Sequence, residues 1–279
     1  MKSRSGGDRL SISSLEMRLD FEKADRRYEK YGLIQAPLLY RGQRVPMKAI
    51  IKGSRVVSIV GRGYKLLPNR LVSEIVSEIA DLFHLEKSRY PKIGGYYEVS
   101  EKENTRSFWT LTFPDEYRVG DEKIHLGLQI RNSEDGSLSF GVDLFTFRTI
   151  CRNGAIVKTK DLAIKSYFRH TKRLEVKGLK LKNMILQILD RGQWILERYQ
   201  RMMEIKMTLE VYEKLKKIPR KYFPEYLRTK EPRVELLSTV TEWDLYNDLT
   251  ANIWHNRRLS MMTRRMLNTV LNRAFSIEG

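Results

Sequence analysis

The most regular alternation of hydrophobic and polar residues lies between residues 124 and 147. In its first half, apolar residues occupy every second position: Ile124, Leu126, Leu128 and Ile130. This spacing predicts a strand with one apolar face, because successive side chains of a strand point to opposite sides. The alternation resumes at Leu138, Phe140 and Val142, and the intervening segment 132–137, Asn-Ser-Glu-Asp-Gly-Ser, has the composition of a turn. We therefore predict a β-hairpin.

Shorter patterns predict the remaining elements. A capping box at Ser13 and a charged stretch after it predict a helix that ends at Gly32. Asn69 is expected to cap a second helix, and strands are expected at 33–40, 45–51, 56–60, 96–100 and 106–113. A basic helix is expected over 161–170, with further helices to the end of the chain. The fold class is α+β: an antiparallel β-sheet with a packed helix, a basic helix after the last strand, and a helical C-terminal part.

The net charge of the chain indicates a class of binding partner. The 279 residues include 52 Lys and Arg against 34 Asp and Glu, a net charge of +18. Most of the excess lies after Cys151, where the net charge is +13, compared with +5 before it. A basic balance concentrated in one part of a chain is typical of nucleic-acid binding, because cations that neutralise phosphates release condensed counterions. Anionic membranes and acidic proteins are the alternative partners.

On this basis we expect three regions. Residues 1–32 form an N-terminal helix or arm, residues 33–175 an α+β nucleic-acid-binding core, and residues 176–279 a helical C-terminal region.

Several chemistries have no support in the sequence. The four histidines are far apart and show no metal-ligand spacing, so neither a metal nor another cofactor is expected. Gly61-Arg62-Gly63 lacks the third glycine of a phosphate loop. No carboxylate cluster stands out near the basic segment, which disfavours an enzyme. A single cysteine and the lack of a long apolar run favour a cytoplasmic protein without a membrane partner.

The basic segment after the hairpin holds the candidate binding residues. Cations recur there at helical spacing among aromatic residues, an arrangement that can hold a nucleic-acid backbone while bases stack on rings. The candidates are Arg148, Arg152, Lys158, Lys160, Lys165, Arg169, Lys172 and Arg173, with Arg62 and Lys65 as a second group. No motif for reading duplex DNA is present, so single-stranded DNA is the expected ligand, with RNA or duplex DNA as alternatives.

Four blocks of the sequence resemble a phage- and plasmid-type family whose domain has no known function. They are residues 49–69, 132–137, 147–154 and 241–250. The blocks occur in the order that the family shows and span most of the chain from about residue 45. The resemblance implies common ancestry and no specific activity.

The order of the predicted elements is also similar to that of the Rad-fifty-two-type single-strand annealing proteins. This resemblance implies an oligomeric ring with a groove for single-stranded DNA beside the sheet. We therefore expect a homo-oligomer that binds and anneals single-stranded DNA in recombination or repair. The alternative is a structural or interaction protein of a mobile element, which would bind its partner through an apolar helical stripe: Trp243, Tyr246, Ile253, Leu267, Val270 and Leu271.

Overall fold

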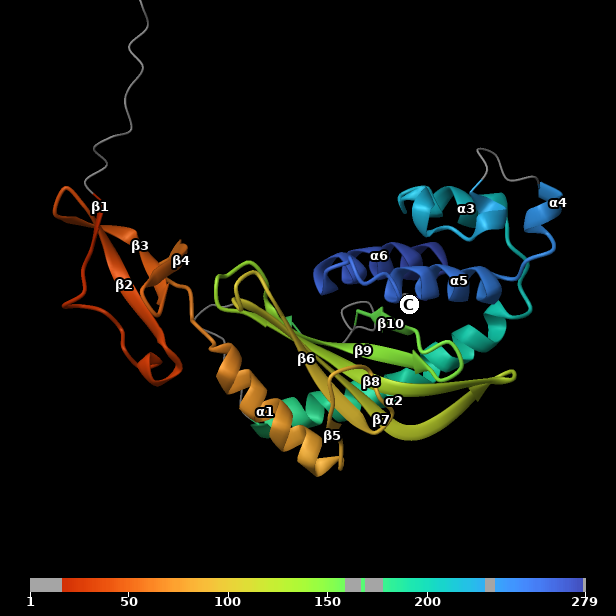
Figure 1. Ribbon diagram of the computed structural model, residues 1–279, viewed down its shortest axis with the longest axis horizontal. Helices are drawn as coiled ribbons and strands as arrows, with labels where there is room; N and C mark the ends of the chain where they lie inside the picture. The colour runs from red at the N-terminus through yellow and green to blue at the C-terminus, as the bar shows by residue number, and fades with distance from the viewer. Residues whose placement is uncertain (1–16, 159–166, 169–177, 229–233, 278–279) are drawn as a thin grey trace, which may run out of the picture. The chain divides into compact units, whose positions relative to one another are not determined.

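The computed structural model describes residues 17–158, 167–168, 178–228 and 234–277 (Figure 1). The chain divides into two compact units, residues 1–64 and 65–279. Each unit is considered by itself below. The α+β class is confirmed, because two mostly antiparallel sheets precede a helical C-terminal part.

The first unit contains a four-stranded antiparallel sheet in the order β1-β2-β3-β4. Its strands are β1 (Met17–Leu19), β2 (Leu33–Tyr40), β3 (Gln43–Lys52) and β4 (Arg55–Gly61). The predicted strands are therefore present, and Gly53 makes the β3–β4 turn with a φ of +60°. A small apolar cluster of Ala36, Ala49 and Ile51 packs on one face of this sheet.

The predicted helix before Gly32 is wrong within the described residues. The segment contains β1 and one short 3-10 helix, η1 (Glu29–Tyr31), and only its end at Gly32, with a φ of +74°, agrees with the prediction. Leu19 pairs with Leu38 of β2, and Asp25 forms a bridge with Gln35. Strand pairing and packing on the sheet outweigh the weak helix preference of a segment with few apolar residues.

The second unit is built around a seven-stranded sheet in the order β10-β9-β8-β7-β6-β5, with β11 also paired to β9. Only the β5–β6 pair is parallel. The strands are β5 (Glu86–Lys87), β6 (Gly95–Glu101), β7 (Arg106–Val119), β8 (Glu122–Ser133), β9 (Phe140–Arg148), β10 (Gly154–Val157) and β11 (Tyr167–Phe168). The hairpin predicted over 124–147 is confirmed as β8 and β9, with Gly136 at a φ of +74° in its turn.

Both faces of this sheet are buried. The alternate residues Ile124, Leu126, Leu128 and Ile130 share one face and one core with α1 (Asn69–Leu82) and α2 (Gly178–Met202). Helix α2 approaches closely, since a Cβ added to Gly192 would lie 2.5 Å from the Leu126 side chain. The opposite face is covered by α5 (Glu242–Trp254) and α6 (Met261–Ala274) (Figure 1). On this face Phe145 of β9 contacts Trp254, with 5.4 Å between the ring centroids.

The second face holds a buried ionic network. Asp143 of β9 is fully buried, and it pairs with Arg131 of β8 and, at 2.6 Å, with Arg265 of α6. Arg265 also donates to Gln129 of β8. A buried carboxylate is tolerated only when such partners compensate for the loss of water. The network therefore ties α6 to the sheet.

The C-terminal helices contribute to the same core. Between α2 and α5 lie α3 (Leu209–Leu215), the 3-10 turns η2 (Arg220–Tyr222) and η3 (Glu225–Leu227), and α4 (Val234–Leu237). Five members of the predicted apolar stripe are buried, namely Trp243, Tyr246, Ile253, Leu267 and Leu271, and Val270 packs against them. The stripe is part of the protein's own interior.

None of the helices in the described segments has the length and apolar character needed to span a bilayer.

The helix predicted over 161–170 is contradicted at Tyr167 and Phe168, which form β11; the remaining residues of this prediction lie outside the described segments. Strand β10 pairs only with residues 144–147 of β9. The start of β9 therefore has an edge to which β11 can bond, at Phe140 and Gly141. Backbone groups at this edge require partners, and two aromatic residues suit a strand.

The turn at 132–137 connects the sheet to α1. Asn69 is the first residue of α1 and not its side-chain cap; its backbone N–H donates to Glu134 Oε1 at 2.8 Å. Asn132 donates from Nδ2 to Leu67 O and to Asn69 Oδ1, both at 2.8 Å. A distant carboxylate thus replaces the local cap that the sequence suggested, and its negative charge suits the positive end of the helix dipole.

Asp135 in the same turn gives a testable pH dependence. Burial alone raises the pKa of this carboxyl, but hydrogen bonds from Lys102 and Ser137 outweigh burial and lower the pKa to about 2. The unfolded value is near 3.9, so the stabilisation is complete above about pH 4 and is lost as the pH falls towards 2.

We expect Asp135→Asn to lower the free energy of unfolding at pH 7 by roughly 2 kcal/mol and to flatten its decline between pH 4.5 and 2. Urea unfolding across this pH range measures both effects. Asp115→Asn, at an exposed position of β7, is the matched control and should retain the wild-type slope. Identical acid profiles for Asp135→Asn and the wild type would contradict the assignment.

Candidate binding pocket beside the β9–β10 turn

The β9–β10 turn is held against α5 by polar contacts. The Arg148 backbone N–H donates to Asn153 O at 2.9 Å and closes the turn. Asn153 donates from Nδ2 to Thr250 Oγ1 of α5 at 3.0 Å. His255, the C-terminal cap of α5, lies 2.7 Å from Cys151 O through its Nε2. These contacts fix the turn relative to the helix.

Arg148 points into the protein. Its guanidinium donates to Glu122 of β8, with a distance of 3.3 Å from Nε to Oε2, and lies 5.5 Å from the centroid of the Trp243 ring. The residue is 9% exposed. A cation with these partners has little contact with solvent, so Arg148 serves the interior rather than an open groove.

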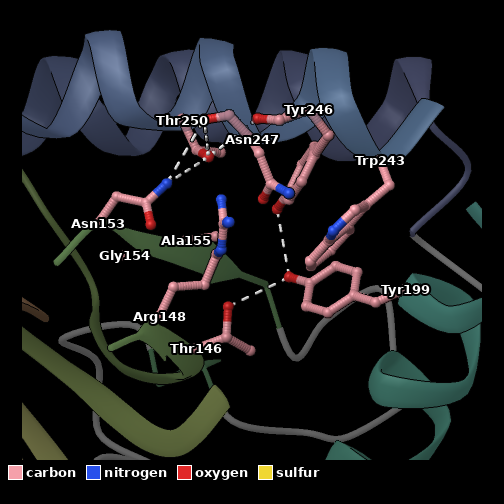
Figure 2. A pocket seen from close by; sticks show the side chains of 10 residues that line it. All are labelled: Thr146, Arg148, Asn153, Gly154, Ala155, Tyr199, Trp243, Tyr246, Asn247 and Thr250. Atoms are coloured by element: carbon pink, nitrogen blue, oxygen red, sulfur yellow. Dashed lines mark hydrogen bonds between the residues drawn. The ribbon is translucent and has the colours of Figure 1, made fainter. Parts of the chain in front are cut away.

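A chain of hydroxyl groups crosses from β9 to α6. Thr146 Oγ1 lies 3.1 Å from Tyr199 OH, which lies 3.3 Å from Tyr246 OH, and Tyr246 donates to Asn272 Oδ1 at 3.2 Å (Figure 2 shows the first two contacts). Burial raises the pKa of both tyrosine hydroxyls, which keeps them neutral. The chain connects α2, α5 and α6 at the edge of the sheet.

A small cavity lies among these groups (Figure 2). Its volume is about 10 Å³, which is close to the room that one water molecule needs. Asn153 and Asn247 line it, and the side-chain oxygens of both are buried without a hydrogen-bond partner. A cavity with two unpaired acceptors suits a donor such as water.

A larger pocket opens next to this cavity and shares Arg148, Trp243 and Asn247 with it. We call it the outer pocket; its volume is about 350 Å³. It is lined by Asp121, Glu122, Arg148, Cys151, Met203, Trp243, Asp244, Asn247, Asp248 and Ala251. Four carboxylates meet here from two distant segments, a cluster that the sequence did not reveal. The one local signal is the spacing of Asp244 and Asp248, which places both on one face of a helix.

The structure describes five of the ten predicted cations: Arg62, Lys65, Arg148, Arg152 and Lys158. Arg152 is exposed on the β9–β10 turn and Lys158 is half-buried after β10, whereas Lys160, Lys165, Arg169, Lys172 and Arg173 lie outside the described residues. Arg62 is exposed after β4 in the first unit, and Lys65 is half-buried at the start of the second.

Two arginines that the sequence analysis did not select lie close to Arg152. The contact between His255 and Cys151 O joins the β9–β10 turn to the start of the α5–α6 connection. Arg257 and Arg258 follow in that connection, and both are exposed. We call Arg152, Arg257 and Arg258 the basic rim. The paired arginines between two predicted helices were the signal available in the sequence.

The ion pair of Arg148 and Glu122 yields a stability prediction. We expect Arg148→Gln to lower the free energy of unfolding by about 2–4 kcal/mol, because it leaves the half-buried Glu122 carboxylate without its cation. Glu122→Gln should lower the free energy of unfolding by a similar amount. The double variant should lower it by clearly less than the sum of the two single losses. Urea unfolding of the three variants tests this double-mutant cycle. Additive losses would show that the two side chains are not coupled.

The sequence blocks that resemble a known family meet in pairs in the structure. Block 49–69 bonds to block 132–137 through Asn69 and Glu134, and block 147–154 bonds to block 241–250 through Asn153 and Thr250.

No curated protein and no solved structure matches the chain, so the likeness to single-strand annealing proteins gains no support from these comparisons. One family does match, over residues 56–276, and it is described as a domain of unknown function, DUF932. Because this match covers most of the chain, the protein belongs to the DUF932 family.

Proposed function

We propose that this protein binds single-stranded nucleic acid without catalysing a reaction on it. The observation that carries the proposal is an excess of exposed cations on the small sheet of the first unit. Residues 17–64 contain eleven Lys and Arg against four Asp and Glu. Such a surface attracts a polyanion and releases its counterions, whatever the base sequence.

Three of the four acids in residues 17–64 are already paired with arginines: Asp20 with Arg44, Asp25 with Arg27, and Glu29 with Arg26. Further arginines gather where the β2–β3 turn lies. Arg41 is in this turn, and Arg18 pairs across β1 and β2 with Leu39, close to the turn. The backbone N–H of Arg62 donates to Pro46 O of β3 at 3.0 Å. This end of the sheet therefore presents three exposed arginines, Arg18, Arg41 and Arg62.

An aromatic ring lies among these cations. Tyr40, at the end of β2, is 39% exposed, and the Arg41 guanidinium lies 5.4 Å from its ring centroid. An exposed ring beside cations is the combination that holds single strands, because bases stack on the ring while cations contact phosphates. Duplex DNA hides its bases from such stacking. The arrangement therefore favours single strands.

The basic rim of the second unit is a separate candidate contact surface. Arg152 lies in the β9–β10 turn, and Arg257 and Arg258 follow His255, which contacts this turn at Cys151 O. No acidic residue lies in 149–154 or 255–260. Arg152 was selected from the sequence for this role, and Arg257 and Arg258 extend it. Arg148 is not part of this proposed contact surface, because it is buried and paired with Glu122.

We further propose that the protein acts as a homo-oligomer in the cytoplasm and promotes annealing of complementary strands during recombination or repair. This part rests on the similarity between the order of elements predicted from the sequence and that of Rad-fifty-two-type proteins, and such a similarity does not itself fix function. The alternative of a partner-binding helical stripe is disfavoured because five of its six residues are buried in the core.

The first test concerns the small sheet. We expect the double variant Arg41→Glu and Arg62→Glu to bind a single-stranded oligonucleotide about tenfold or more weakly at low salt. The slope of log K against log salt should fall by about 1.4, because two phosphate contacts are lost. Fluorescence anisotropy with single-stranded and duplex oligonucleotides over a salt series measures both. The control is Lys87→Glu with Lys217→Glu, which makes the same charge change at exposed positions elsewhere and should keep the wild-type slope.

The second test concerns the basic rim. Arg152→Glu with Arg258→Glu should cause a comparable loss of affinity and slope, measured in the same assay with the same control. Light scattering should give an oligomer for the wild type and for both double variants, since none of these residues is in a described apolar core. If both double variants bound single strands as tightly as the wild type at every salt concentration, the proposed function would be wrong.

A further inference from the structure

We propose that the outer pocket binds the ammonium or guanidinium group of an organic cation. This inference does not depend on nucleic-acid binding. It rests on the charge of the pocket wall, on the acceptor atoms that the wall presents, and on one buried side chain without a partner.

The wall combines four segments, one of which is Met203 directly after α2. The β7–β8 turn contributes Asp121, the first residue of β8 is Glu122, and the β9–β10 turn contributes Cys151. One face of α5 contributes Asp244, Asn247, Asp248 and Ala251, which recur at helical spacing. Met203 and Trp243 supply apolar surface. A volume of about 350 Å³ lies within the range of small-molecule sites.

The charge of this wall opposes that of the protein. Glu122 is neutralised by Arg148, which leaves Asp121, Asp244 and Asp248 as net negative charges in a chain of net charge +18. The local field also acts on Tyr226. Burial and the carboxylates of Asp248 and Asp244 together raise the pKa of its hydroxyl. An anion would be repelled from this pocket, whereas a cation would be attracted.

The carboxylates retain acceptor atoms. Asp244 uses Oδ2 to accept from the backbone and hydroxyl of Thr241, at 3.1 and 2.6 Å. Asp248 uses Oδ2 to accept from Tyr226 OH at 2.8 Å. Within the described residues, Oδ1 of each and both carboxylate oxygens of Asp121 have no partner. An ammonium group has three donors and a guanidinium five, so either can engage several of these oxygens.

Asn247 provides an independent indication of a ligand. The residue is 8% exposed, it lines both the outer pocket and the small cavity, and its Oδ1 has no hydrogen-bond partner. In Figure 2 its side chain extends from α5 into the space between Tyr246 and Arg148. Leaving such an acceptor unsatisfied costs stability, and a donor from a ligand, reaching the buried Oδ1 through one water, would remove that cost.

A metal ion is a poorer occupant than an organic cation. In the part of the chain that the structure describes, no three His, Cys, Asp or Glu side chains are grouped closely enough to hold a metal ion. The carboxylates are instead spread around a pocket of molecular size. This spacing fits a donor group carried on an organic body that contacts Trp243 and Met203.

Isothermal titration calorimetry with agmatine, putrescine and uncharged 1,4-butanediol tests the proposal on the full chain. We expect saturable binding of the two amines and none of the diol. Asp121→Asn should weaken agmatine binding roughly five- to tenfold, because it removes one charge without breaking a described hydrogen bond. Asn247→Leu should also weaken it, since the unpaired acceptor is lost. Asp115→Asn, an equal charge change away from the pocket, should bind as the wild type does.

Light scattering distinguishes a free amine from a basic side chain of a second copy of the chain. If the cation that occupies the pocket is a side chain of a second copy, agmatine and Asp121→Asn should each reduce the oligomer size. If the source is a free amine, agmatine should bind without changing it. No saturable binding by folded protein, equal binding of the diol, or unchanged agmatine affinity in Asp121→Asn would each overturn the proposal.

Discussion

The larger unit depends on the burial of both faces of one antiparallel sheet. Its first face is apolar and needs only α1 and α2 to exclude water. Its second face carries Gln129, Arg131 and the fully buried Asp143, which require polar partners. Arg131 pairs with Asp143 within the sheet, and Arg265 of α6 supplies a second partner for Asp143 and a donor for Gln129. These buried contacts tie α6 to the sheet, so the C-terminal helices complete the sheet and do not form a separate appendage.

Docking of α5 and α6 in turn creates the pocket. With α5 in place, Trp243 meets the Arg148 guanidinium, Asn153 bonds to Thr250, and Asp244 and Asp248 lie opposite the β7–β8 turn. The family blocks that contain these residues are far apart in the chain but contact one another here. Hydrogen bonds between these blocks explain the residue types at Asn69, Glu134, Asn153 and Thr250.

The distribution of charge separates two kinds of surface. The small sheet and the basic rim present arginines to solvent, as polyanion binding requires, whereas the outer pocket presents carboxylates. A nucleic-acid strand that contacted the rim would be repelled from the pocket, because phosphates and carboxylates have like charge. The two proposed ligands therefore differ in sign and need not compete.

The sequence by itself determined the α+β class, the β8–β9 hairpin and the core positions, because strand alternation and turn composition are local properties. It also determined the excess of positive charge. Tertiary structure decided the rest. Residues 17–19 and 167–168 became strands because sheet edges were available to pair with them. Arg148 became an interior cation because Glu122 and Trp243, 26 and 95 residues away, converge on it. The acidic pocket likewise arises from segments that no local pattern connects, since folding alone brings their charges together.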